Sequence, residues 1–160
     1  SMYGVNCGVP KTLVRWMIAA LIDYNIFPDS THVLEDIIDT PISPELLPPD
    51  EDGNIRQETE EIIGPYALHD FFLYHLLRFG FSPSKIFFLA EEAFKEDFDR
   101  ETVLKWLKVF YKRFFTQQFK RSCLPDGVKI GSVCLSPRGD WRMPSDASYA
   151  IWLREIDEIK

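Results

Sequence analysis

The chain has 160 residues, of which 46% are hydrophobic and 14% aromatic, enough length and apolar content for one folded domain. No apolar run approaches the roughly 20 residues that cross a bilayer, so we expect no membrane association. The formal net charge of −7 disfavours general nucleic-acid binding. Three cysteines without a CxxC pair disfavour a disulfide framework or a zinc site, and we expect a cytoplasmic protein.

Hydrophobic spacing and capping residues predict helices over most of the chain. The first runs from about Pro10 to Tyr24 and is apolar nearly all round, which predicts burial against several partners. A short amphipathic helix with Ser30 as its N-cap follows, although the same residues also suit a strand. Further helices are predicted at 66–79, 83–94, about 100–118 and from 145 or 146 onward.

Two long charged loops interrupt the helical pattern. Residues 39–57 are acidic and rich in proline, whereas residues 120–144 are basic and contain several glycines and prolines. Between Thr102 and Arg142 nine Lys and Arg face only two Asp, a net charge of +7, so the remainder of the chain carries −14. A basic loop of this kind suits the binding of phosphate or carboxylate groups. Both loops have the composition of a lid.

Common catalytic motifs are absent from the sequence. It contains no GxSxG, GxGxxG, Walker-type or HExxH pattern, and the SxxK spacing of Ser82 and Lys85 is better explained by helix capping. From the residues alone we expect a helical unit whose acidic and basic loops together hold a metal–phosphate ligand.

Four segments resemble a known family. They are 6–13, 39–46, 66–75 and, most specifically, 119–146, which includes Leu-Ser-Pro-Arg-Gly-Asp-Trp-Arg. All are similar to the large, glutamine-dependent NAD synthetases of bacteria, and the last is similar to their C-terminal signature. The resemblance covers nearly the whole chain.

The resemblance implies that residues 1–160 are the mainly α-helical C-terminal portion of an α/β synthetase domain of the ATP-pyrophosphatase type (adenine nucleotide α-hydrolase-like). The family's SGGxDS loop, which holds the ATP phosphates, and its glutaminase domain would lie upstream. The implied reaction amidates deamido-NAD to NAD. ATP and Mg²⁺ adenylate the nicotinate carboxylate, and ammonia from glutamine then displaces AMP. A homo-oligomeric full-length enzyme is also implied, and the fragment alone is expected to be inactive.

The resemblance also assigns roles to basic residues. Lys120 and Arg121 match a His-Lys-Arg sequence in the loop that closes over the dinucleotide, with Phe119 in place of the histidine, and are expected to bind substrate. Lys11 matches a lysine that approaches the ATP phosphates, and its position at a helix start favours anions. An ordinary exposed lysine is the alternative for Lys11. No catalytic residue is assigned within the chain.

Three further roles fall within the acidic loop 39–57 or just after it. Glu60 matches the glutamate of a QxDExxxG pattern that holds Mg²⁺, although Thr59 replaces the aspartate, and a solvated acidic loop remains the alternative. Ser43 and Glu45 resemble the Thr and Asp of a PTADL segment near the substrate. A different class of function also stays open, namely a non-catalytic helical module that dimerises or docks a partner. Such a module would not need the basic loop.

Overall fold

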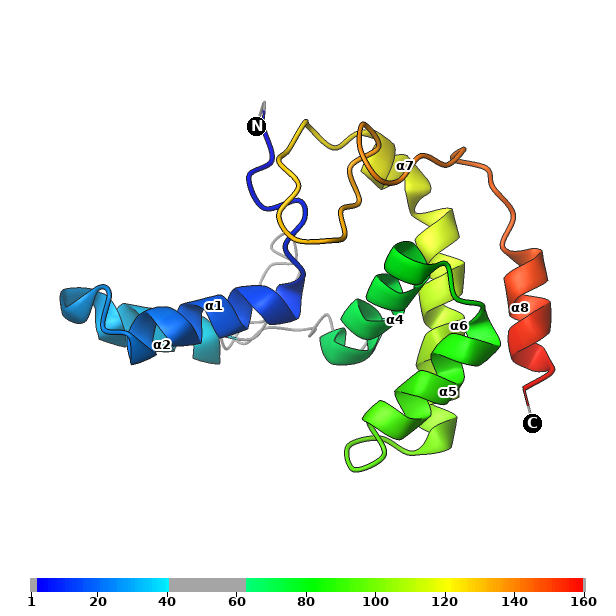
Figure 1. Ribbon diagram of the computed structural model, residues 1–160, viewed down its shortest axis with the longest axis horizontal. Coiled ribbons are helices and arrows are strands. Elements are labelled where there is room, and N and C mark those ends of the chain that lie inside the picture. Colours follow the sequence, from blue (N-terminus) through cyan, green and yellow to red (C-terminus); the bar gives the residue numbers. More distant parts are fainter. Residues whose placement is uncertain (1–2, 41–62, 160) are drawn as a thin grey trace, which may run out of the picture. The chain divides into compact units, whose positions relative to one another are not determined.

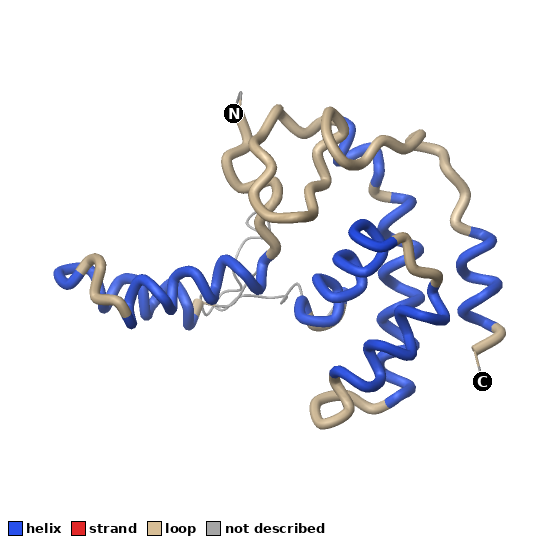
Figure 2. The backbone as a smooth tube through the Cα atoms, viewed as in Figure 1, coloured by secondary structure: helices blue, strands red, loops and turns tan. Residues whose placement is uncertain are grey.

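The computed structural model describes residues 3–40 and 63–159, which form helices and no strand (Figures 1 and 2). They divide into two compact units, each described here by itself. Residues 10–40 and 63–66 form the α1–α2 unit, and residues 3–9 and 67–159 form the α4–α8 unit. No helix in the described ranges is long and apolar enough to cross a membrane.

The α1–α2 unit confirms the two helices predicted near the N-terminus. α1 spans Lys11–Asp23, the short 3₁₀ helix η1 spans Pro28–Ser30, and α2 spans Thr31–Asp39, so the strand alternative for the last segment is wrong. Ser30 precedes α2, as predicted, but its side chain makes no capping hydrogen bond.

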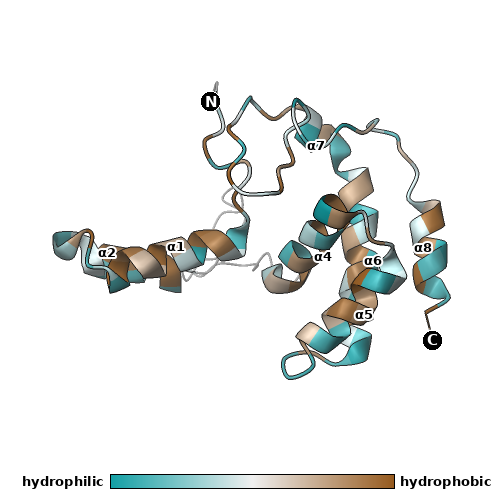
Figure 3. Cartoon of the chain, in the orientation of Figure 1, coloured by the Kyte–Doolittle hydropathy of each residue, from teal (hydrophilic) through white to brown (hydrophobic). Residues whose placement is uncertain are grey.

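The predicted burial of α1 is not found in the described residues. α2 is the helix that packs on α1, and no residue of α1 is buried. Trp16 is 72% exposed, and the apolar character of the helix is visible along its ribbon in Figure 3. The sequence indicates that the helix is apolar, but only the number of packing partners decides how much of that surface is covered.

The α4–α8 unit contains the helices α4 (Tyr66–Phe79), α5 (Pro83–Ala93), α6 (Arg100–Thr116), α7 (Gln118–Ser122) and α8 (Ala150–Asp157). The first three agree with the predicted ranges to within about two residues. Gly80 ends α4 at φ +64°, a left-handed conformation that glycine adopts without strain. Asp99 begins α6 by accepting a hydrogen bond from Thr102 N at 2.7 Å, as a capping aspartate should.

The core of this unit is built on one face of α6. Buried side chains recur along it at intervals of three and four residues, which places them on one stripe of the helix: Val103, Leu107, Phe110, Tyr111, Phe114 and Phe115. Phe72 of α4 contacts Phe110 with ring centroids 5.6 Å apart, and Trp152 of α8 lies 4.6 Å from Phe115. α4, α5 and α8 therefore meet on a common aromatic face.

Two predicted boundaries are wrong. Residues 120–122 belong to α7 instead of the irregular segment, and the last helix begins at Ala150, not at Ser145 or Asp146. Ala147 and Tyr149 pack against the core in non-helical backbone, which delays the start of α8. The connecting loop therefore runs from residue 123 to residue 149.

The N-terminus of α5 donates its capping hydrogen bond to a side chain of a distant helix. Ser82 precedes Pro83, as predicted, but makes no capping bond within its own helix. Instead, Glu155 Oε1 in α8 accepts a hydrogen bond from Ser84 N at 2.9 Å. Burial raises the pKa of Glu155, but the hydrogen bonds from Ser84 and Ser82 outweigh it and lower the pKa below its ordinary value of 4.5. A carboxylate at a helix N-terminus also interacts favourably with the helix dipole.

Replacing Glu155 by Gln should lower the free energy of unfolding by about 0.5–1 kcal/mol at pH 7. Because the folded-state pKa of Glu155 lies below its unfolded value, its stabilising effect is present above pH 4.5 and is lost as the pH falls through the folded-state pKa. Thermal melts between pH 3 and 7 should therefore show the difference from the unmodified chain shrinking in acid. Glu158→Gln, in the exposed turn after α8, is the matched control. A difference independent of pH would contradict this role.

Candidate functional site

The basic loop lies beside the N-terminal segment of the same unit. Residues 3–9 run along residues 124–134, although more than a hundred residues separate them in the sequence (Figure 1). Tyr3 and Asp126 form an isolated parallel bridge, and Gly4 N donates a hydrogen bond to Asp126 O at 2.6 Å. The loop thus has a fixed neighbour on one side.

Gly127 allows this close approach. A Cβ atom at this position would collide with Gly4 O and Cys7 Sγ, at separations that real Cβ atoms do not show. The glycine is therefore required by the contact between two backbone segments, a reason that only the tertiary structure reveals.

The basic side chains of the loop are held by partners inside the loop. Lys129 Nζ lies 2.7 Å from Asp140 Oδ2, and Arg138 Nε lies 2.8 Å from Asp126 Oδ1. Main-chain carbonyls accept two further bonds, from Arg138 Nη1 to Leu124 O at 2.8 Å and from Arg142 Nε to Pro137 O at 3.0 Å. Much of the positive charge that the sequence places here therefore stabilises the loop itself.

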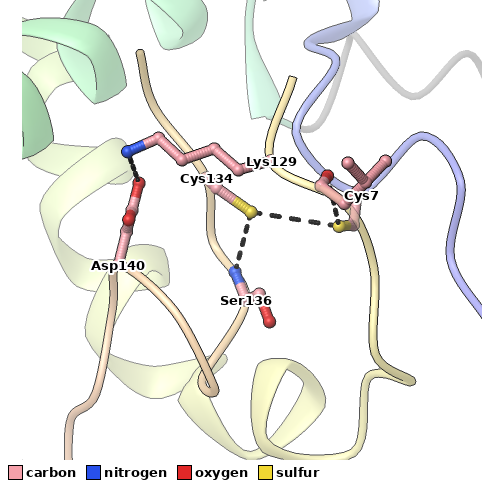
Figure 4. Close-up of polar contacts among 6 residues, drawn as sticks. Cys7, Lys129, Cys134, Ser136 and Asp140 are labelled. Atoms are coloured by element: carbon pink, nitrogen blue, oxygen red, sulfur yellow. Dashed lines mark hydrogen bonds and ion pairs between the residues drawn. The ribbon is translucent and has the colours of Figure 1, made fainter. Parts of the chain in front are cut away.

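Two cysteines meet where the loop contacts the N-terminal segment (Figure 4). Cys7 Sγ lies 3.9 Å from Cys134 Sγ, and Cys134 is only 3% exposed. Ser136 N donates to Cys134 Sγ at 3.4 Å, and Cys7 Sγ donates to Val128 O at 3.8 Å. Burial raises the pKa of the Cys7 thiol, and its hydrogen bond with Cys134 raises it further. The odd number of cysteines in the sequence gives no signal of this pair.

Arg121, a predicted substrate-binding residue, is engaged with the protein. Its Nε donates to Gln118 Oε1 at 2.8 Å, its Nη2 donates to Phe114 O in the last turn of α6, and its guanidinium stacks 4.4 Å from the Phe114 ring. Burial lowers its pKa. Gln118 is itself buried. These contacts make Arg121 the residue that joins α7 to the end of α6.

Lys120, the neighbouring predicted residue, is exposed. Its Nζ lies 6.0 Å from the centroid of the exposed Phe119 ring, and no ion pair to it is found within the described part of the chain. One turn of α7 therefore places Arg121 towards the protein and Lys120 towards solvent.

The remaining predicted residues lie elsewhere. Lys11 is the first residue of α1, as predicted, and is exposed, but it belongs to the α1–α2 unit and is described only within that unit. Ser43, Glu45 and Glu60 lie outside the described residues. Within 3–40 and 63–159, no three His, Cys, Asp or Glu side chains gather where they could hold a metal ion.

Sequence comparison identifies close relatives of the chain. A glutamine-dependent NAD(+) synthetase of Mycobacterium leprae is 44% identical to it over 176 aligned positions, covering 98% of the chain. The synthetases of that name from Mycobacterium tuberculosis and Mycobacterium bovis are 43% identical over the same share. The chain spans about a quarter (26%) of the length of these curated relatives. A scan of family models finds no match. The similarity confirms the resemblance indicated by the four sequence segments.

Substitutions of the two adjacent basic residues in α7 should distinguish a charge that stabilises the fold from one that is exposed to solvent. Arg121→Ala removes charge-assisted hydrogen bonds worth about 1.5–3 kcal/mol. At roughly 2–4 °C per kcal/mol for a chain of this size, the melting temperature should fall by roughly 3–12 °C. Lys120→Ala, one residue earlier, should change it by less than about 1 °C because its side chain is exposed. Circular dichroism melts of both variants test this. Equal effects would contradict the assignment.

Proposed function

We propose that this chain, a homologue of a portion of the glutamine-dependent NAD(+) synthetases, contributes to the synthetase site of a ligase that amidates deamido-NAD. In the proposed reaction the nicotinate carboxylate attacks the α-phosphorus of ATP, releasing pyrophosphate and forming an NAD-adenylate. Ammonia from glutamine then attacks the activated carbonyl carbon, and AMP leaves. A carboxylate accepts an amine poorly, and the mixed anhydride supplies the leaving group that the amidation needs.

One observation supports a role for this chain: the basic side chains between residues 117 and 144 differ from one another in whether the protein pairs them. Arg121, Lys129 and Arg138 are held by protein acceptors, whereas the exposed Lys120, next to Arg121 in α7, has no ion pair among the described residues. The substrates of the proposed reaction are polyanions, and an exposed ammonium group can donate to their phosphate oxygens. We assign Lys120 to phosphate binding, with Arg121 fixing the helix α7 that carries it.

Mg²⁺ would neutralise the ATP phosphates during adenylation. The described residues gather no set of carboxylates that fits the ion, so they are assigned no step through it. Glu60, which lies outside the described residues, remains the proposed contact to Mg²⁺, and Lys11 at the start of α1 the proposed contact to the ATP phosphates. Ser43 and Glu45 remain proposed substrate contacts.

A second candidate function has its own supporting observation. Large apolar side chains of the α1–α2 unit are exposed, among them Trp16, Met17 and Tyr24. Exposed large apolar side chains are typical of surfaces that contact another protein. A helical docking module would use this surface and would leave Lys120 without a role. Kinetics of a Lys120 variant therefore discriminate between the two functions.

In the full-length enzyme, Lys120→Ala should lower kcat/KM for NAD synthesis by roughly 10- to 100-fold with either ammonia or glutamine, if one charge-assisted bond worth about 1.5–3 kcal/mol is lost from the transition state. Glutamine hydrolysis should be unchanged, because it occurs at a different site. Lys120→Arg should recover part of the activity by keeping the charge. Lys112→Ala, an exposed lysine on α6, is the control. An unchanged kcat/KM for Lys120→Ala would remove Lys120 from the site.

The 160-residue chain by itself should synthesise no NAD from ammonia, ATP and deamido-NAD. Its sequence contains no SGGxDS loop, which the proposed reaction requires to hold the ATP phosphates during adenylation. Chromatographic detection of NAD after prolonged incubation measures this directly, with a full-length relative as the positive control. Measurable turnover by the chain alone would show that the site is complete without that loop.

A further inference from the structure

Cys7 and Cys134 are two free thiols held close together by distant parts of the chain (Figure 4). Their sulfur atoms are 3.9 Å apart, and 127 residues separate them in sequence. The sulfur–sulfur bond of a disulfide is about 2.05 Å long, so closure requires an approach of about 2 Å.

Contacts on both sides fix this proximity. The hydrogen bond from Gly4 N to Asp126 O joins the two segments near Cys7, and Gly127 lets them approach closely. Cys134 is buried and receives a hydrogen bond from Ser136 N. Cys123, the third cysteine, is exposed at the end of α7. The structure therefore distinguishes one pair among the three thiols.

We propose that Cys7 and Cys134 form a redox modification site, in which a peroxide converts the two thiols into a reversible disulfide that fastens the basic loop to the N-terminal segment. This inference goes beyond the proposed function and does not rest on it. It concerns only residues of the α4–α8 unit.

The reaction balances with hydrogen peroxide as the oxidant. The Cys7 thiol, the more accessible of the two, gives up its proton and attacks one peroxide oxygen. The O–O bond breaks, a sulfenic acid forms, and the leaving hydroxide takes the thiol proton to become water. The Cys134 sulfur then attacks the sulfenic sulfur, the S–O bond breaks, and the leaving hydroxide takes the Cys134 thiol proton to become a second water. Two thiols are thereby oxidised by two electrons and the peroxide is reduced to two waters. A dithiol such as dithiothreitol reverses the bond by exchange.

Peptide mapping of the full 160-residue chain tests the proposal. Trypsin places the three cysteines in separate peptides, 1–11, 122–129 and 130–138. The reduced native chain is treated with a small excess of hydrogen peroxide, its remaining thiols are blocked with N-ethylmaleimide, and the digest is examined by mass spectrometry. We expect a cross-linked product of peptides 1–11 and 130–138, with peptide 122–129 alkylated, and recovery of all three free peptides after dithiothreitol.

Two variants and a denatured sample distinguish pairing set by the native geometry from random pairing. Cys123→Ser should leave the cross-link unchanged, whereas Cys134→Ser should abolish it. In denaturant the native product should no longer dominate, because Cys123 and Cys134 are close in sequence and the shorter loop closes at lower entropic cost. A native chain that yields mainly a Cys123 disulfide, mainly intermolecular disulfides or no cross-link between peptides 1–11 and 130–138 would overturn the proposal.

Discussion

Burial of one face of α6 is the interaction on which the α4–α8 unit depends. Side chains from Val103 to Phe115 line that face, and α4, α5 and α8 pack on it. Each fully buried large apolar side chain contributes about 1.5–3 kcal/mol relative to its exposed state, so the side chains of this face together outweigh any single polar contact in the unit. α8 packs on the same face of α6, although α7 ends at Ser122 and α8 begins only at Ala150. The chain between them therefore forms a long irregular loop, residues 123–149. Lys120 and Arg121 lie in α7, immediately before this segment, and Lys129 and Arg138 lie within it.

Contacts on two sides of the loop 123–149 explain how an irregular segment acquires a defined position. Exposed ion pairs such as Arg138–Asp126 are each worth only about 0–1 kcal/mol, so they do not hold the loop alone. Leu135, Trp141 and Met143 pack against the core, and the Trp141 ring lies 5.1 Å from that of Phe114. These contacts attach the loop to the core on one side, while residues 3–9 hold it on the other. A disulfide at Cys7 and Cys134 would act at that second attachment.

The proposed ligase role and the docking alternative use different surfaces. Lys120 belongs to the α4–α8 unit, whereas the exposed apolar residues Trp16 and Tyr24 belong to the α1–α2 unit. The chain matches 26% of the length of these relatives, so they contain long stretches without a counterpart in it.

The sequence by itself determined the helices that local signals specify. Apolar periodicity, Gly80 after α4 and Asp99 before α6 each act through neighbours within a few residues, so those boundaries could be predicted, and four sequence segments were enough to indicate the family. Tertiary structure decided the rest. The start of α8 depends on the packing of Tyr149, and the N-terminal cap of α5 depends on Glu155 in α8. The different placements of Lys120 and Arg121 depend on which side of α7 meets α6. The approach of Cys7 to Cys134 joins segments far apart along the chain, and no periodicity or local spacing carries that information.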